Sequence, residues 1–125
     1  MADTCALGVF RKSQTHIGAL ALADRYFSNF VGGALGRLSP EHIRDQVKSP
    51  TLSDVILEHL SEFYRSLETL LNTRGTPALT FHAARAQSLP LDGQLGTLFE
   101  QAPNRIDVEA SVKGYGKGRF ALVLF

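Results

Sequence analysis

The sequence predicts a single α+β domain, with N-terminal helices that include one long amphipathic helix, followed by a small sheet ending in an antiparallel β-hairpin. Three observations support this fold class. Apolar residues recur at three- and four-residue steps in the first 75 residues, they alternate with polar residues over 106–113, and a glycine-rich turn follows at 114–118. A chain of 125 residues suits one domain, with a helical part at about 15–75 and an α/β part at about 78–125.

The first predicted helix covers the apolar segment around residues 17–31, and glycines at 32, 33 and 36 end it. The basic pair Arg11 and Lys12 before the run Ile17–Ala23 also has features of a secretion signal. Against that reading, Asp3 lies in the basic region, and the run is at the short limit of about 7–15 residues. We therefore interpret this segment as a buried helix.

A second, short helix begins at Ser39-Pro40-Glu41. Serine can cap the helix, proline suits its first position, and glutamate faces its positive end. The helix carries Ile43 and Val47 on its apolar side and is expected to stop by Ser49.

The long amphipathic helix follows, with Thr51 and Asp54 as a possible capping box and Gly75 and Pro77 at its end. Its apolar stripe recurs at helical spacing and consists of Leu52, Val55, Ile56, His59, Leu60, Phe63, Leu67, Leu70 and Leu71. The stripe spans about five turns, more than a short partner helix can cover. We therefore expect the helix to mediate assembly, with Leu60, Phe63 and Leu67 as interaction residues.

The second half predicts a sheet. A short strand is expected at 79–84 and a short helix after Pro90. Residues 106–113 alternate as in a half-buried strand, with Ile106, Val108, Ala110 and Val112 on the buried face. The returning strand, 120–125, is apolar on both faces and is expected to be central in the sheet.

Catalytic and metal-binding signatures are missing from the sequence. The four histidines lack a ligand spacing, and no nucleophile elbow occurs. Cys5 is the only cysteine, so it cannot form an internal disulfide or a cysteine-based zinc cluster, and we interpret it as an inert thiol. The sequence thus predicts no enzyme, metal or cofactor. A small enzyme with an unrecognised site is kept as a third possibility, which a deep pocket with convergent polar groups would favour.

The basic segment from Lys113 to Arg119 supplies an alternative function. Lys113, Tyr115, Lys117 and Arg119 could contact a nucleic acid, and the segment matches part of the RNA-recognition octamer. That fold would need a further helix and strand, for which only five residues remain. The net charge of +1 shows no overall basic character. A glycine-rich hairpin with solubilising charges is the favoured reading, and nucleic-acid binding stays open.

Two segments together resemble a known family. The first is Ile56-Leu-Glu-His-Leu60 followed by Leu67, Leu70, Leu71, Asn72, Thr73, Arg74 and Gly75. The second combines Phe99, Glu100, Pro103, Arg105 and Ile106 before the closing hairpin. Over about residues 52–125 the chain resembles the contractile-tail baseplate wedge family, which includes TssE-like proteins of type VI secretion and phage tail lysozyme-like proteins. Gln101, Ala102 and Asn104 interrupt the second motif, and the family's Tyr-Gly-Leu-Pro-Asp stretch is absent.

The resemblance implies a non-enzymatic structural or adaptor subunit, with Arg74 and Arg105 as assembly contacts. The expected partners are other proteins or further copies of the chain. No stretch approaches the roughly 18 apolar residues of a membrane span, and the single cysteine suits a reducing compartment, so we expect a cytoplasmic protein.

Overall fold

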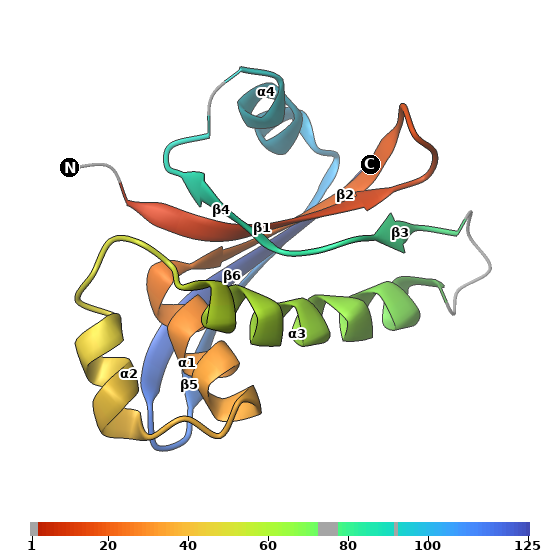
Figure 1. Cartoon of the computed structure of the whole chain (residues 1–125). Helices are drawn as coiled ribbons and strands as arrows, with labels where there is room; N and C mark the ends of the chain where they lie inside the picture. Colours follow the sequence, from red (N-terminus) through yellow and green to blue (C-terminus); the bar gives the residue numbers. More distant parts are fainter. Residues whose placement is uncertain (1–2, 73–77, 92) are drawn as a thin grey trace.

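The structure, a computed structural model, describes residues 3–72, 78–91 and 93–125. The helices are α1 (Arg25–Leu35), α2 (Pro40–Gln46), α3 (Asp54–Asn72) and α4 (Gly93–Gln101). The strands are β1 (Thr4–Arg11), β2 (Ile17–Asp24), β3 (Thr80–Phe81), β4 (Arg85–Ser88), β5 (Asn104–Val112) and β6 (Gly116–Leu124). The fold is α+β, but two strands come first, so the prediction that helices precede the sheet is wrong (Figure 1).

One antiparallel sheet of six strands joins both ends of the chain. The strand order is β3-β1-β2-β6-β5, and β4 also pairs with β1. The β1–β2 hairpin is N-terminal, the β5–β6 hairpin is C-terminal, and β2 pairs with β6 between them. Residues from both halves of the chain therefore build the same sheet.

The segment Ile17–Ala23, predicted as a helix, is strand β2. It lies between β1 and β6, and Ala19, Leu20, Ala21 and Ala23 are all fully buried. A strand covered on both faces has apolar residues at every position, so it lacks the alternation that marks a half-buried strand. Alanine and leucine also favour helices, and here tertiary burial overrides that preference.

Helix α1 begins directly after β2 because Asp24 caps it. The Asp24 carboxylate accepts a hydrogen bond of 2.7 Å from the backbone N–H of Phe27. Helix α2 begins as predicted, with Ser39 accepting from the N–H of His42 and proline at the first helical position.

The long amphipathic helix is confirmed as α3. Its N-terminal cap is Ser53, whose hydroxyl accepts from the N–H of Ile56 at 3.2 Å, rather than the predicted pair Thr51 and Asp54. Its buried face carries Ile56, Leu60, Ser61 and Tyr64.

Helices cover both faces of the sheet. On one face, α1 and α3 enclose an aromatic core that includes Phe10, Phe27, Tyr64, Phe81 and Phe120. On the other face, α4 contributes Leu95, Leu98 and Phe99 to a smaller cluster with Leu7, Leu20 and Val123. Figure 1 shows α4 on one side of the sheet and α1, α2 and α3 on the opposite side.

The C-terminal hairpin is confirmed. β5 and β6 pair over nine successive positions, and the N–H of Tyr115 donates to the carbonyl of Val112 at 2.9 Å to close the turn. As predicted, β6 is an interior strand, with β2 on one side and β5 on the other. β5 is at the edge.

Candidate functional site

The predicted interaction residues of α3 pack against the chain's own sheet. Leu60 is fully buried, and Phe63 and Leu67 are partly buried against the same aromatic core. Phe63 contacts the rings of Phe27 and Phe120 at centroid distances of 5.6 Å. The fold itself thus accounts for the central part of the apolar stripe.

Of the two arginines that the family resemblance implies as contacts, Arg74 lies outside the described residues. Arg105 lies on β5, where its guanidinium stacks 4.4 Å from the ring centre of Phe99 and donates two hydrogen bonds to Asp107, at 2.8 and 3.0 Å. The hydrogen bond from Arg105 lowers the pKa of the Asp107 carboxyl, and the same bond raises the pKa of Arg105. The pair is about half exposed, so it fixes the side chains more than it stabilises the fold.

The basic hairpin segment has several internal contacts. Tyr115 donates its hydroxyl to the carbonyl of Leu38 at 2.6 Å, and its ring packs against a cluster of α1, α2 and α3 residues. Arg119 forms an ion pair of 3.5 Å with Glu109 on the neighbouring strand. Lys113 and Lys117 are exposed. Lys117 lines a shallow pocket together with the carboxylates of Asp24 and Glu109, so the surface here carries charges of both signs.

The glycines of this segment have a packing role. A Cβ atom added at Gly118 would lie 2.3 Å from the backbone of Phe27, and one added at Gly116 would lie 2.8 Å from the ring of Phe30. Gly114 has φ of +86° in the turn, a conformation that favours glycine. The glycine pattern therefore allows β6 to approach α1 closely and the chain to turn.

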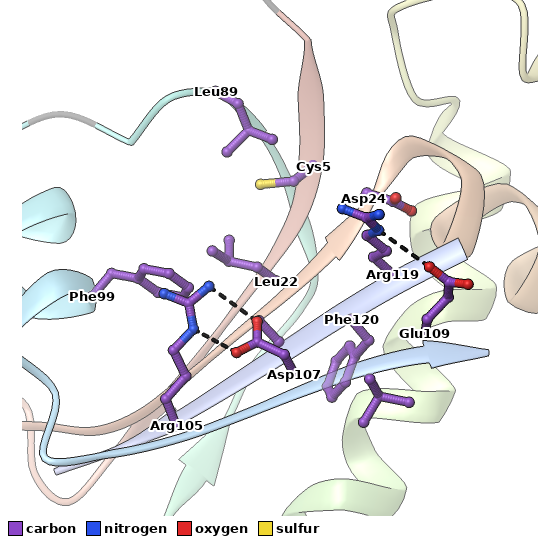
Figure 2. Close-up of a pocket in the computed structure, with 12 residues that line it drawn as sticks. Cys5, Leu22, Asp24, Leu89, Phe99, Arg105, Asp107, Glu109, Arg119 and Phe120 are labelled. Atoms are coloured by element: carbon purple, nitrogen blue, oxygen red, sulfur yellow. Dashed lines mark hydrogen bonds and ion pairs between the residues drawn. The ribbon is translucent and has the colours of Figure 1, made fainter. Parts of the chain in front are cut away.

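A pocket of about 500 Å³ lies on the sheet face that carries α4, beside Cys5 (Figure 2). Leu22, Leu89 and Phe99 supply apolar walls, and the ion pairs Arg105–Asp107 and Arg119–Glu109 lie along its β5–β6 side. Its apolar surroundings explain why burial raises the pKa of the Cys5 thiol to about 12, with a smaller contribution from Asp3 and Asp24. The thiol stays protonated at neutral pH and is a poor nucleophile.

The polar groups of this pocket are engaged with one another. Both guanidinium groups contact carboxylates, and Asp24 is occupied as the cap of α1. Elsewhere in the described ranges, no three histidine, cysteine, aspartate or glutamate residues come close enough to hold a metal ion. The pocket offers an apolar cavity with a charged rim.

The exposed surface of β5 is the other candidate site. The sequence analysis named Arg105 of this strand as a contact but did not predict the exposed edge. β5 pairs with β6 on one side, and no strand of the described segments pairs with its other side. Ile106 is 51% exposed and Val108 is 42% exposed, although the alternation predicted a buried face for both. Arg105, Asp107 and Glu109 occupy the alternate positions and are also exposed. The strand therefore presents an apolar face, a charged face and a free backbone edge.

An apolar groove adjoins this strand on the face covered by α3. It has a volume of about 580 Å³ and lies between the C-terminal part of α3 and the β5–β6 hairpin. Leu70 and Leu71 of α3, Leu79, and Ile106 of β5 contribute to its walls. The alternation over 106–112 could have signalled this surface only if the strand had been recognised as an edge.

Within the described part of the chain, no helix has the length and apolar character needed to span a membrane. The resemblance to the baseplate wedge family rests on the sequence motifs alone, since comparison of the chain with protein-family models, curated proteins and solved structures found no match.

Proposed function

We propose that this protein is a non-enzymatic structural or adaptor subunit that binds another protein chain along the β5 edge. One observation carries the proposal: β5 is a long, regular edge strand with exposed apolar side chains. Its nine residues, NRIDVEASV, contain no lysine, proline or glycine, and its pairing with β6 shows no bulge. Proteins normally protect exposed edges with lysine or other charged residues, with proline, with bulges or with very short strands. Of these devices β5 has the charges of Arg105, Asp107 and Glu109.

The opposite edge of the sheet is protected in the usual way. There β1 pairs with β3 and β4, which have two and four residues. Short edge strands offer few successive backbone groups to another chain. The difference between the two edges favours β5 as the side that meets a partner.

The side chains of β5 support the same function. Ile106 and Val108 leave about half of their surface exposed, and burying the remainder would contribute about 1 kcal/mol each. An added strand would also complete the backbone hydrogen bonds of the edge, which is the usual mode of strand addition to a sheet. Affinity would come from the backbone and the apolar face, and specificity from the charged face.

A contractile-tail baseplate component is the specific assembly that the sequence resemblance suggests. The support is the order of motifs, an amphipathic helix followed by Phe99, Glu100, Arg105 and a closing hairpin. Arg105 lies on the exposed edge strand, where a partner can reach it. Sheath and baseplate genes next to the gene for this chain would favour this form, and their absence would remove it while leaving the edge-binding function intact.

Photo-crosslinking in cells that produce the protein tests the proposed function. The photoreactive residue p-benzoylphenylalanine replaces Ile106 in one variant and Val55, also 51% exposed, in the control. We expect discrete protein adducts from position 106 and none from position 55, at equal melting temperature. A lack of discrete adducts from position 106 would overturn the proposal.

A further inference from the structure

We propose that the chain that pairs with β5 is β5 of a second copy, antiparallel to the first, with a two-fold axis at Asp107. This inference rests on the proposed function and names its partner. The two sheets would then form one continuous sheet across the interface. A two-fold pairing uses the same surface on both copies, as in most homodimers.

The side-chain pattern of β5 restricts how two copies can pair. Ile106, Val108 and Ala110 are alternate residues of the strand and therefore share one face. They pair with Leu122, Phe120 and Gly118 of β6. In an antiparallel pair, residues directly opposite each other point to the same face. Apolar positions therefore meet apolar positions only when the two-fold axis lies midway between one residue and the same residue of the second copy.

An axis at Asp107 gives the most complementary register. Arg105 then lies opposite Glu109 of the second copy, and Ile106 lies opposite Val108, each pair occurring twice. An axis at Val108 would place Asp107 opposite Glu109 twice and would bring no opposite charges together, and like charges directly opposite destabilise a sheet. An axis at Ile106 would pair only residues 104–108 and would place Val108 opposite Asn104.

In this register the charged face carries equal numbers of positive and negative side chains. Each copy contributes two guanidinium groups and two carboxylates, already joined as Arg105–Asp107 and Arg119–Glu109. The unfavourable meeting of the two Asp107 carboxylates at the axis is offset because each one accepts two hydrogen bonds from its own Arg105, at 2.8 and 3.0 Å. The dimer adds a contact between Arg105 and Glu109 on each side of the axis.

The apolar face reaches the groove beside α3. Asn104 and Ile106 line this groove, and in the proposed register they lie opposite Ala110 and Val108 of the second copy. The partner strand would therefore place apolar side chains next to Leu70 and Leu71. Strand pairing over seven residues alone buries less surface than a specific interface needs. In the proposed dimer, the groove supplies the additional apolar contact.

Analytical ultracentrifugation of the purified full chain tests the dimer. The measurements cover about a hundredfold concentration range, wide enough to cross a dissociation constant in the micromolar region. We expect a reversible dimer. The Val108→Lys variant should dissociate at least about tenfold more readily, since lysine on an edge opposes strand addition. The control Val55→Lys, at a similarly exposed site on α3, should leave the dimer unchanged.

Disulfide trapping tests the register. Two residues on a two-fold axis between antiparallel strands have Cα atoms about 4.5–5.5 Å apart, a distance that a disulfide spans. In a Cys5→Ala background, we expect the Asp107→Cys variant to form a covalent dimer on mild oxidation and the Glu109→Cys variant to remain monomeric. Efficient trapping of Glu109→Cys, or of a Val108→Cys variant in preference to Asp107→Cys, would overturn this register.

A monomer at every concentration would overturn the self-pairing. If position 106 still gave discrete adducts with a different protein, the proposed function would stand and the second copy would be excluded as partner. If it gave no discrete adduct, both would fall. Equal dissociation of Val108→Lys and Val55→Lys would exclude β5 as the interface.

Discussion

The hydroxyl of Tyr64 on α3 donates a 2.7 Å hydrogen bond to the main-chain carbonyl of Ala6 on β1. Both residues are fully buried, and burial raises the pKa of the tyrosine well above its ordinary value. The ring lies edge-on to Phe10 and Phe81, and a Cβ atom at Gly8 would come within 2.8 Å of it. This contact fixes the long helix to its own sheet.

Removing that hydroxyl should lower stability without changing the fold. We expect Tyr64→Phe to reduce the free energy of unfolding by about 1–2 kcal/mol, because the buried carbonyl of Ala6 loses a donor while the ring packing remains. Tyr26, 40% exposed on α1, is the matched control, and Tyr26→Phe should stay within about 0.5 kcal/mol of the wild type. Urea denaturation measures both, and equal values for the two variants would contradict the structural role of Tyr64.

Sequence reasoning was most successful where an element has one apolar face. α3 shows helical spacing because only one side of it meets the sheet, and Ser39-Pro40 begins α2 through a local capping interaction. The closing hairpin was also recognisable from its alternation and its turn glycines. In each case the signal lies in neighbouring residues, so no knowledge of the tertiary structure was needed.

The first hairpin was missed because its burial depends on distant residues. β1 and β2 are covered by α1, α3 and α4, and β2 also pairs with β6, about a hundred residues away in sequence. Two apolar runs flanking the polar segment at 11–16 were the available signal for a hairpin. The exposure of β5 was unpredictable for the same reason, since alternation cannot tell an edge strand from a covered one.

The close approach of β6 to α1 makes Gly118 sensitive to substitution. A Cβ atom there would lie 2.3 Å from the backbone of Phe27, which cannot yield as a flexible side chain could. We expect Gly118→Ala to destabilise the fold by about 1–3 kcal/mol or more, as overpacking does. Ser111→Ala, at an exposed position of β5, should have little effect in the same thermal or urea denaturation. A Gly118→Ala variant as stable as the wild type would contradict this packing of β6 on α1.

The buried thiol of Cys5 predicts a loss of stability at alkaline pH. Its pKa is raised from 9.0 to about 12 in the folded state. Above pH 9 the unfolded chain loses the thiol proton while the folded chain keeps it, so rising pH favours unfolding. Its contribution to stability is therefore complete below about pH 9 and declines as the pH rises toward 12, with a slope of at most about 1.4 kcal/mol per pH unit. The wild type should lose stability more steeply between pH 9 and 10 than the Cys5→Ala variant.

A thiol reagent gives an independent measurement on Cys5. At neutral pH the native thiol is buried and protonated, so it should react slowly with an aromatic disulfide reagent and rapidly after urea denaturation. Rapid reaction of the native protein, or identical pH profiles for the wild type and Cys5→Ala, would contradict the burial of this residue.

The basic hairpin offers a direct comparison between the leading function and nucleic-acid binding. Arg119 is paired with Glu109, Tyr115 donates its hydroxyl to the carbonyl of Leu38, and the carboxylates of Asp24 and Glu109 lie beside Lys117. We expect no measurable binding of single-stranded RNA or DNA at about 50 mM salt. Fluorescence anisotropy with labelled oligonucleotides measures this.

Binding that weakens steeply with salt would instead favour the nucleic-acid function. Each phosphate contact would contribute a log–log slope of about −0.7 on a single strand, and replacement of Lys113, Lys117 and Arg119 by alanine should abolish that dependence. The Val108→Lys variant tests the other surface, because it adds a positive charge at the β5 edge and should disrupt strand pairing without removing a basic residue of the hairpin. If the triple alanine variant lost nucleic-acid binding while β5 pairing persisted, the two surfaces would act independently. If neither the wild type nor the variant bound the oligonucleotide, the hairpin would be a structural element that supports β5.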